Sequence, residues 1–169
     1  MSVGMSDIQW MELGSVLKQI HTTELPPAVS QYVKQETFIP NWSKTARELH
    51  DQVNTRNYEN PYQKEFATFW REKNETIQTL IERAEMVGEY LAQMDLEFVL
   101  CHADIHTANI LITPEQDMCI IDWDETLLAP KERDLMFILD EDTIRTREEQ
   151  LFFNGYGNVK INQPVITYY

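Results

Sequence analysis

The sequence predicts a mostly helical α+β fold, built as a single domain of 169 residues. Three observations lead to this expectation. Apolar residues recur at helical spacing through much of residues 7–94. Short apolar segments, partly β-branched, follow between residues 98 and 122 and read as strands. Hydrophobic residues make up 43% of the chain, which is enough for a packed core and is not a disordered composition.

Helix signals dominate the first half of the chain. Ser6 and Gln9 have the spacing of a capping box, and the apolar residues after them predict a helix over residues 7–21. Pro26-Pro27 marks its exit, and residues 28–42 predict no clear element. Further helices are expected from Ser43 to about Asn54, from Pro61 after Asn60, and over residues 75–94.

The pattern changes at Phe98. Strands are expected over residues 98–101, 109–112 and 118–122, the last two joined by a turn at residues 113–117. Helical character returns at about residues 131–140 and 146–153, with a loop at residues 154–158 and a further helix opening at Pro164. The sequence therefore predicts a helical domain with a small central β element.

The charge balance narrows the classes of partner. Fourteen Lys and Arg stand against 28 Asp and Glu, a net charge of −14. A nucleic-acid backbone calls for a basic patch, so we expect no nucleic-acid partner. An acidic surface would favour a cationic small molecule, although it also serves simply as a solvated surface. The run Asp140-Glu141-Asp142 allows the same two interpretations.

The cysteines and the apolar segments indicate the cellular compartment of the protein. Cys101 and Cys119 lie inside apolar, strand-like segments, where a thiol behaves as a small hydrophobe. No disulfide framework is implied, which fits a reducing cytoplasm. Residues 1–10 do not resemble a signal peptide, and no apolar run approaches the roughly 18 residues of a membrane span. We therefore expect a cytoplasmic protein without a membrane partner.

The segment from His102 to Asn109, followed by Asp122, carries the chemistry. Asp104 is the candidate catalytic base, because a carboxylate there could orient an attacking hydroxyl and accept its proton. Asn109 and Asp122 are the candidate cofactor-binding and metal residues, since oxygen ligands suit Mg²⁺. Two of the three have a plain alternative: Asp104 as a turn residue and Asn109 as a strand-entry residue. Their combination beside short strands favours a phosphoryl-transfer site.

The neighbouring polar residues are harder to assign. His102 belongs with the catalytic group but would brace the loop through hydrogen bonds, whereas His106 is either a loop residue or a substrate contact. Asp124 would either join the metal site or cap the following segment. His102, Asp104 and His106 could instead form a zinc site, but their spacing suits a helix and this segment does not read as helical.

These motifs resemble those of the aminoglycoside phosphotransferase and choline kinase family, whose fold is similar to that of protein kinases. The family pattern H-G-D-x-H-x-x-N stands here as residues 102–109, with Ala103 in place of Gly, and I-D-W/F-x-D/E stands as residues 121–124. Residues 128–135 resemble the segment after the metal-binding Asp, in which Asp134 is expected to anchor a helix start. Residues 13–21 resemble the family's first helix after the hinge. The sequence around both motifs is similar to that of spectinomycin-type phosphotransferases.

The resemblance covers one lobe of that fold. The five glycines are scattered, and neither a Gly-rich loop nor a V-A-I-K-like strand is present. Residues 1–169 therefore resemble the C-terminal, substrate-binding and catalytic lobe, with the nucleotide lobe absent. Uncovered apolar surface facing the hinge would then favour self-association.

The resemblance implies transfer of the γ-phosphate of ATP or GTP, with Mg²⁺, to a hydroxyl of a small cationic substrate, aminoglycoside-like or choline-like. We expect the chain to be inactive by itself. Two alternatives are a truncated, non-catalytic module that binds a small molecule or associates with itself, and a zinc hydrolase.

Overall fold

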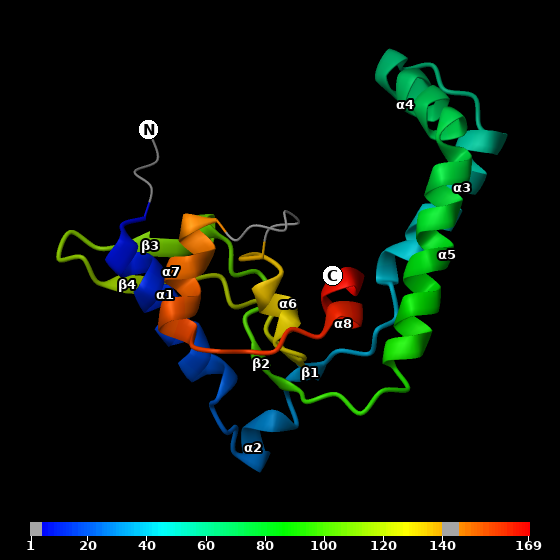
Figure 1. The fold of residues 1–169 in the computed structure, drawn as a ribbon. Coiled ribbons are helices and arrows are strands. Elements are labelled where there is room, and N and C mark those ends of the chain that lie inside the picture. Colours follow the sequence, from blue (N-terminus) through cyan, green and yellow to red (C-terminus); the bar gives the residue numbers. More distant parts are fainter. Residues whose placement is uncertain (1–4, 140–145) are drawn as a thin grey trace. The chain divides into compact units, whose positions relative to one another are not determined.

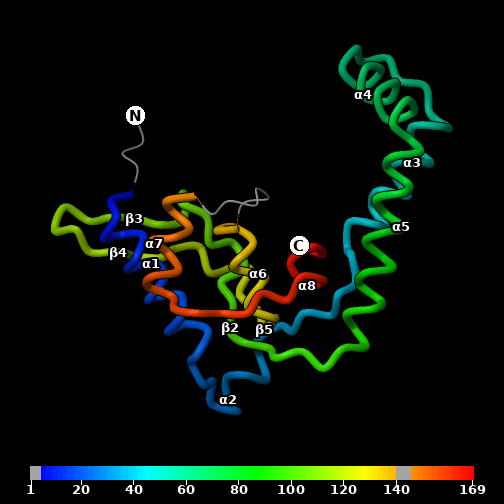
Figure 2. The backbone as a smooth tube through the Cα atoms, viewed as in Figure 1, coloured from blue at the N-terminus to red at the C-terminus, as the bar shows by residue number. Residues whose placement is uncertain are grey.

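The computed structural model describes residues 5–139 and 146–169 (Figure 1). Their contacts form two compact units. Unit 1 comprises residues 1–36, 95–167 and 169, and unit 2 comprises residues 37–94 and 168. The chain passes from unit 1 into unit 2 and back (Figure 2). The acidic run at residues 140–142 lies outside the described residues.

Two capped helices form the centre of unit 1. The predicted capping box opens α1 (Asp7–His21), and a second box, from Thr146 and Glu149, opens α7 (Arg147–Tyr156). An ion pair of 2.5 Å joins Arg147 to Asp7 at the two N-terminal ends. A hydrogen bond at the other ends joins His21 to Tyr156, so the helices lie side by side and run the same way (Figure 1).

The core of unit 1 is built where α1 and α7 meet the segments around the predicted catalytic residues. Its buried members are Leu13, Leu17, Ile105, Ile110, Leu135, Phe152, Phe153 and Tyr156. Ile105 lies within the predicted catalytic segment and is only 1% exposed. Its burial fixes that segment to the helical core.

Among the described residues of unit 1, five short strands form two small sheets. The first sheet has the order β1 (Lys34–Gln35), β5 (Leu127–Ala129) and β2 (Val99–Cys101). The second pairs β3 (Ile110–Ile112) with β4 (Met118–Ile120) in antiparallel register. The three predicted strands are confirmed, although they divide between two sheets and the third ends at Ile120 instead of Asp122. The sequence prediction missed β1 and β5.

Short helices complete unit 1. They are α2 (Pro27–Ser30), the 3₁₀ turn η1 (Thr107–Asn109), α6 (Glu132–Leu135) and α8 (Gln163–Tyr168), whose residues 163–167 count with this unit. The helix expected at residues 131–140 is thus a single turn. The loop expected at residues 154–158 is wrong in part, because α7 continues to Tyr156 before Gly157 adopts a positive φ of 88°.

Unit 2 consists of the helices α3 (Asn41–Thr55), α4 (Pro61–Glu72) and α5 (Asn74–Leu91). The side chain of Asn60 caps α4 as predicted. The expected cap at Ser43 is wrong: α3 begins two residues earlier, and the Ser43 N–H donates to the Pro40 carbonyl within the first turn. Val53, Ala67 and Ile81 are buried where the helices meet.

Candidate active site

The predicted catalytic segment leaves β2 and turns at once. Ala103 has a left-handed φ of 71°, a conformation that the side chain of alanine disfavours. His102, Ala103 and Ile105 are buried, whereas the side chain of Asp104 between them is 37% exposed. The turn thus directs one carboxylate of this segment toward solvent while its neighbours hold the backbone in the core.

Asn109 returns to Asp104 through the tight 3₁₀ turn η1. Its side-chain Nδ2 donates to Asp104 twice, to Oδ2 and to the main-chain carbonyl, each at 2.9 Å. The Asn109 side chain makes no further hydrogen bond through its oxygen among the described residues. The structure therefore brings these two predicted site residues together and leaves an amide oxygen for another ligand.

His102 braces the segment with both ring nitrogens. Nδ1 accepts from the Asp104 main-chain N–H at 3.2 Å, so Nε2 carries the hydrogen and donates to the Ile121 carbonyl at 2.9 Å. The residue is 0% exposed, and its ring meets Trp123 edge to face at 4.6 Å. This arrangement leaves no ring nitrogen for a metal, which counts against the zinc-hydrolase alternative.

The backbone of Ile121 also connects Asp122 to the predicted catalytic segment. The Ile121 N–H donates to the Asn109 carbonyl at 3.0 Å, extending the β3–β4 ladder by one pair. Asp122 follows with a left-handed φ of 66°. It is exposed and makes no hydrogen bond with any residue that the structure describes. A free carboxylate therefore follows directly after the backbone that holds Asn109.

Asp124 and His106 lie at the exposed margin of this site. Asp124 is exposed and shows neither an ion pair nor a capping bond within residues 5–139 and 146–169, so its metal role stays a prediction. The side chain of His106 is 42% exposed, with Nε2 at 3.5 Å from Asp104 Oδ2. His106 Nδ1 accepts from the Ala108 N–H.

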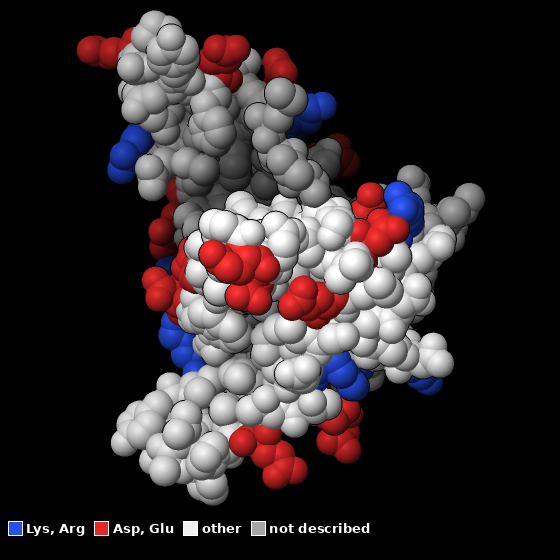
Figure 3. All heavy atoms as spheres, turned by 90° about the vertical axis from the view of Figure 1, so that its left-hand side faces the viewer, with Lys and Arg blue, Asp and Glu red and all other residues white. Residues whose placement is uncertain are grey.

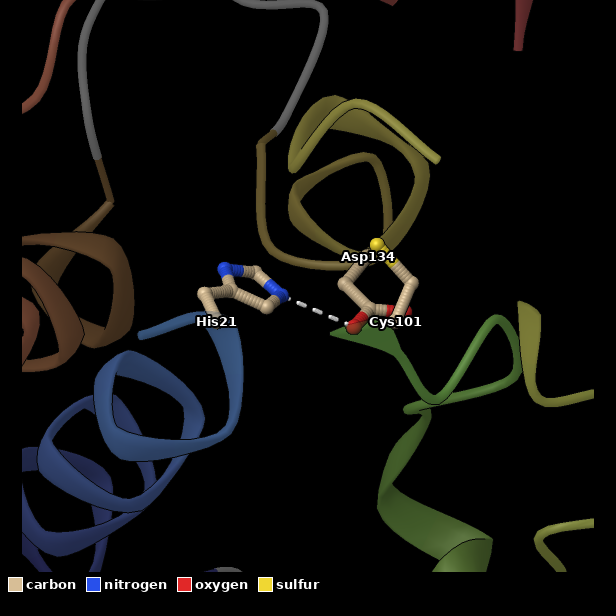
Figure 4. Close-up of side chains that lie close together, drawn as sticks. All are labelled: His21, Cys101 and Asp134. Carbon is tan, nitrogen blue, oxygen red and sulfur yellow. Dashed lines mark hydrogen bonds and ion pairs between the residues drawn. The ribbon is translucent and has the colours of Figure 1, made fainter. Parts of the chain in front are cut away.

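Asp134 has a role that the sequence interpretation missed. The expectation that it anchors a helix start is wrong, because no side chain caps α6. Its buried carboxylate instead accepts from the main-chain N–H groups of His102, at 2.9 Å, and Ala103, at 2.6 Å. The one sequence signal that pointed to Asp134 was the resemblance of residues 128–135 to a family segment. No local pattern indicated its third partner, His21 (Figure 4).

The sequence model of the phosphotransferase enzyme family matches residues 6–163. The chain belongs to this family. Two solved structures of spectinomycin phosphotransferase APH(9)-Ia, one with ADP and spectinomycin and one with AMP, are each 35% identical to it with a TM-score of 0.84. They match 99% of this chain but only 52% and 54% of their own chains. The chain thus spans about half the length of these structures.

A third solved structure is only distantly similar to this chain. The choline kinase LicA from Streptococcus pneumoniae is 14% identical, with a TM-score of 0.48 over 96% of this chain and 50% of its own. No curated protein sequence matches the chain. The mostly helical α+β, kinase-like fold that the sequence predicts is confirmed by the spectinomycin phosphotransferase match.

Unit 2 of this phosphotransferase family member contains a separate open pocket of about 520 Å³. It lies between α3 and α5, over Phe38 and Gly88. Six charged side chains line it: Lys44, Arg47, Glu48, Asp51, Glu85 and Glu89. Arg47 and Glu85 pair across it at 2.6 Å, so the remaining charge is predominantly negative. Among the described residues, no helix is long and apolar enough to cross a membrane.

Proposed function

We propose that residues 1–169 form the catalytic, substrate-binding lobe of a phosphotransferase, which transfers the γ-phosphate of ATP or GTP to a hydroxyl of a small cationic substrate. The observation that carries this proposal is the double link of Asn109. Its side chain holds the Asp104 carboxylate, and its carbonyl holds the backbone beside Asp122. The three residues expected to act together thus share one hydrogen-bonded frame within unit 1.

Asp104 would act on the attacking hydroxyl. The Asn109 amide occupies Oδ2 of Asp104, which leaves Oδ1 to accept a hydrogen bond from an incoming hydroxyl. Its 37% exposure gives a substrate access to that oxygen. A carboxylate so placed orients the hydroxyl and takes its proton as the phosphoryl group transfers.

The oxygen donors present fit a magnesium site. The Asn109 amide oxygen and the unpaired Asp122 carboxylate are hard ligands of the kind that Mg²⁺ prefers. Bound there with the nucleotide, Mg²⁺ would neutralise charge on the phosphates. We assign Asn109 and Asp122 to the metal and nucleotide phosphates, with Asp124 as a further carboxylate beside them.

Charge and relatives support a cationic substrate. The chain carries a net charge of −14, and Figure 3 shows carboxylates spread across the drawn face. The relatives of known structure at 35% identity include a complex of a phosphotransferase with spectinomycin. We therefore propose an aminoglycoside-like substrate of the spectinomycin type.

The chain by itself is expected to show little turnover. Residues 1–169 contain no Gly-rich loop, and the chain spans about half of the solved spectinomycin phosphotransferases. The test is a chimera in which the rest of APH(9)-Ia is joined to these residues. With Mg²⁺, ATP or GTP and spectinomycin, we expect the chimera to release nucleoside diphosphate and the isolated chain to release almost none.

Asp104→Asn in this chimera should lower kcat by about 10²–10⁴-fold, the usual range for loss of a general base. Asp117→Asn, in the exposed β3–β4 turn, is the matched control and should leave kcat unchanged. A well-folded chimera whose turnover ignores Asp104→Asn would refute the catalytic assignment. Strong turnover by the isolated chain would refute the claim of inactivity.

A second candidate is a non-catalytic module that associates with itself. Trp42 and Tyr62 in unit 2 are each 81% exposed, which favours burial against a partner. Sedimentation at rising concentration tests this candidate, with Trp42→Ser as the variant that should weaken association. A monomer at every concentration would contradict it.

A further inference from the structure

Another pocket, of about 460 Å³, opens within unit 2 where α3 leads into α4 (Figure 1). Its lining residues come from the connecting loop and from α4: Arg56, Asn57, Tyr58, Lys64, Ala67, Thr68 and Arg71. The members from α4 recur at spacings of three and four residues, so they follow one face of that helix. A pocket of this size has room for a small organic molecule, since such sites measure about 300–1,000 Å³.

The lining of this pocket is basic, although the chain is acidic. Arg56, Lys64 and Arg71 line it, and none of the other lining residues is Asp or Glu. The whole chain carries twice as many acidic as basic residues, 28 against 14. Within residues 5–139 and 146–169, none of these three cations forms an ion pair. Like charges gathered without a counterion repel one another, so an anion in the pocket would be attracted by all three.

Arg71 is held in a fixed direction. Its Nη2 donates to the carbonyl of Val53, in the last turn of α3. A guanidinium has five N–H donors in a planar fork, and the bond to Val53 uses one of them. Ala67, on the same face of α4, is 1% exposed where α4 packs against α3. Packing thus fixes the face that carries Lys64 and Arg71, and Arg71 retains donors for a phosphate group.

The uncharged loop residues add further donors. The side chains of Asn57 and Tyr58 make no hydrogen bond with any residue that the structure describes. An amide N–H and a phenol O–H both donate readily to phosphate oxygens. Tyr58 is half-buried, so its ring also gives the pocket an apolar surface.

We propose that this pocket binds a small molecule through a phosphate group that carries at least two negative charges. Three unpaired cations match such a group better than a carboxylate, which carries one charge. A long polyanion such as a nucleic acid is disfavoured, because the net charge of −14 repels it. The proposal does not depend on the proposed function, since its residues belong to unit 2 and the proposed catalytic residues belong to unit 1.

A purely structural role is the competing interpretation of these cations. A cation near the C-terminus of a helix is favourable, and the bond from Arg71 to Val53 gives α3 such a cation. This role does not explain Arg56 and Lys64, whose side chains bond to no residue in the described part of the chain. The structural interpretation therefore predicts that removing these two charges leaves anion binding unchanged.

Pyrophosphate titration of the ¹⁵N-labelled chain, without Mg²⁺, tests the proposal. Amide signals of residues 56–58 and 64–71 should shift to saturation, ahead of signals elsewhere in the chain. Arg56→Gln combined with Lys64→Gln should weaken this binding at least about tenfold, because two charged donors are lost. Both residues are exposed and Arg71 is left intact, so the variant should keep the fold.

The matched control removes the same charge elsewhere in unit 2. Lys73→Gln combined with Arg83→Gln alters two exposed cations that do not line the pocket. Because solvent and salt screen such charges from the bound anion, the affinity should fall less than about twofold. If the pocket double variant does not fold, Lys64→Gln alone decides: a loss of about threefold supports the proposal, and no loss overturns it.

ATP and adenosine identify the source of the phosphate. Tighter binding of ATP than of pyrophosphate at the same amides supports a phosphate ester as the ligand, and equal or weaker binding supports a free phosphate. Signals of residues 104–109 report separately on ATP at the proposed catalytic segment. The proposal is overturned if adenosine binds as tightly as ATP, if pyrophosphate shifts do not saturate or spread over the whole chain, or if the two double variants lose affinity equally.

Discussion

At Ala103 the backbone conformation explains the residue type that the family pattern has at this position. The resemblance places Gly at this position, and the structure shows why: φ is 71°, in the region that favours glycine. Its methyl group is nevertheless buried, at 1% exposure. The left-handed conformation costs roughly 1–2 kcal/mol, and the hydrogen bond from the Ala103 N–H to Asp134 stabilises it.

Ala103→Gly should therefore change stability little. Loss of the buried methyl, about 0.8 kcal/mol, and the added chain freedom are offset by relief of the left-handed conformation. The control is Ala129→Gly in β5, equally buried but in ordinary strand geometry. Chemical denaturation should show Ala129→Gly losing about 1–2 kcal/mol more. Equal losses would contradict the account of Ala103.

The proximity of site residues was predictable where the residues lie close together in the sequence. Asp104, Asn109 and Asp122 stand at spacings that one turn and one hairpin bring together, and the structure places the first two in direct contact. His21 and Asp134 are separated by 113 residues, and only tertiary packing makes them partners. No pattern within α1 distinguishes its histidine, His21, from an exposed one.

At the level of elements, α1 and α7 pack with their backbones in contact. A Cβ on Gly14 would overlap the Phe152 carbonyl oxygen and lie 2.7 Å from the Tyr156 nitrogen, and one on Gly155 would overlap the Met11 carbonyl. The sequence showed these glycines as scattered residues, because their use appears only when the two helices meet.

Gly14→Ala should destabilise unit 1. The forced separation of the helices costs about 1–3 kcal/mol and outweighs the helix-propensity gain of about 1 kcal/mol. Ser15→Ala, at the next position, removes only a 3.3 Å hydrogen bond to Gly155 and should cost less than about 1 kcal/mol. Thermal unfolding compares the two. A neutral Gly14→Ala would show that the helices do not pack this closely.

Elements with local signals were predicted and elements without them were not. The capping box gave the start of α1, the helical spacing of its apolar residues gave its end, and Asn60-Pro61 gave the start of α4. Strand β5 was missed because its three residues gain strand geometry only between β1 and β2. The helix expected at residues 131–140 ends at Leu135, because the N–H groups of Phe137 and Ile138 then bond to carbonyls only three residues back, in turns.

For the whole molecule, buried acids predict a loss of stability at alkaline pH. Burial raises the pKa of the Cys101 thiol and of the Tyr156 phenol well above their ordinary values. Above about pH 8.5 the unfolded chain releases the Cys101 proton while the folded chain keeps it. Stability from this group is therefore complete below that pH and falls by up to about 1.4 kcal/mol per pH unit above it.

Denaturant unfolding between pH 7 and 10 measures this slope. Cys101→Ala should flatten the decline between pH 8.5 and 10, before the tyrosine contributes. Cys119→Ala is the control, because that thiol is exposed. An identical pH profile for Cys101→Ala and the wild type would contradict the assigned burial of a protonated thiol.

The proposed function depends on Asn109 and Asp122 holding a divalent cation beside the Asp104 carboxylate, and Mn²⁺ titration of the ¹⁵N-labelled chain tests this most directly. At low Mn²⁺, amide signals at residues 104–109 and 121–124 should broaden before those near other carboxylates. Asp122→Asn combined with Asn109→Ala should abolish this preference, and Asp117→Asn should preserve it. Broadening spread evenly over the acidic surface, indifferent to the double substitution, would contradict the claim.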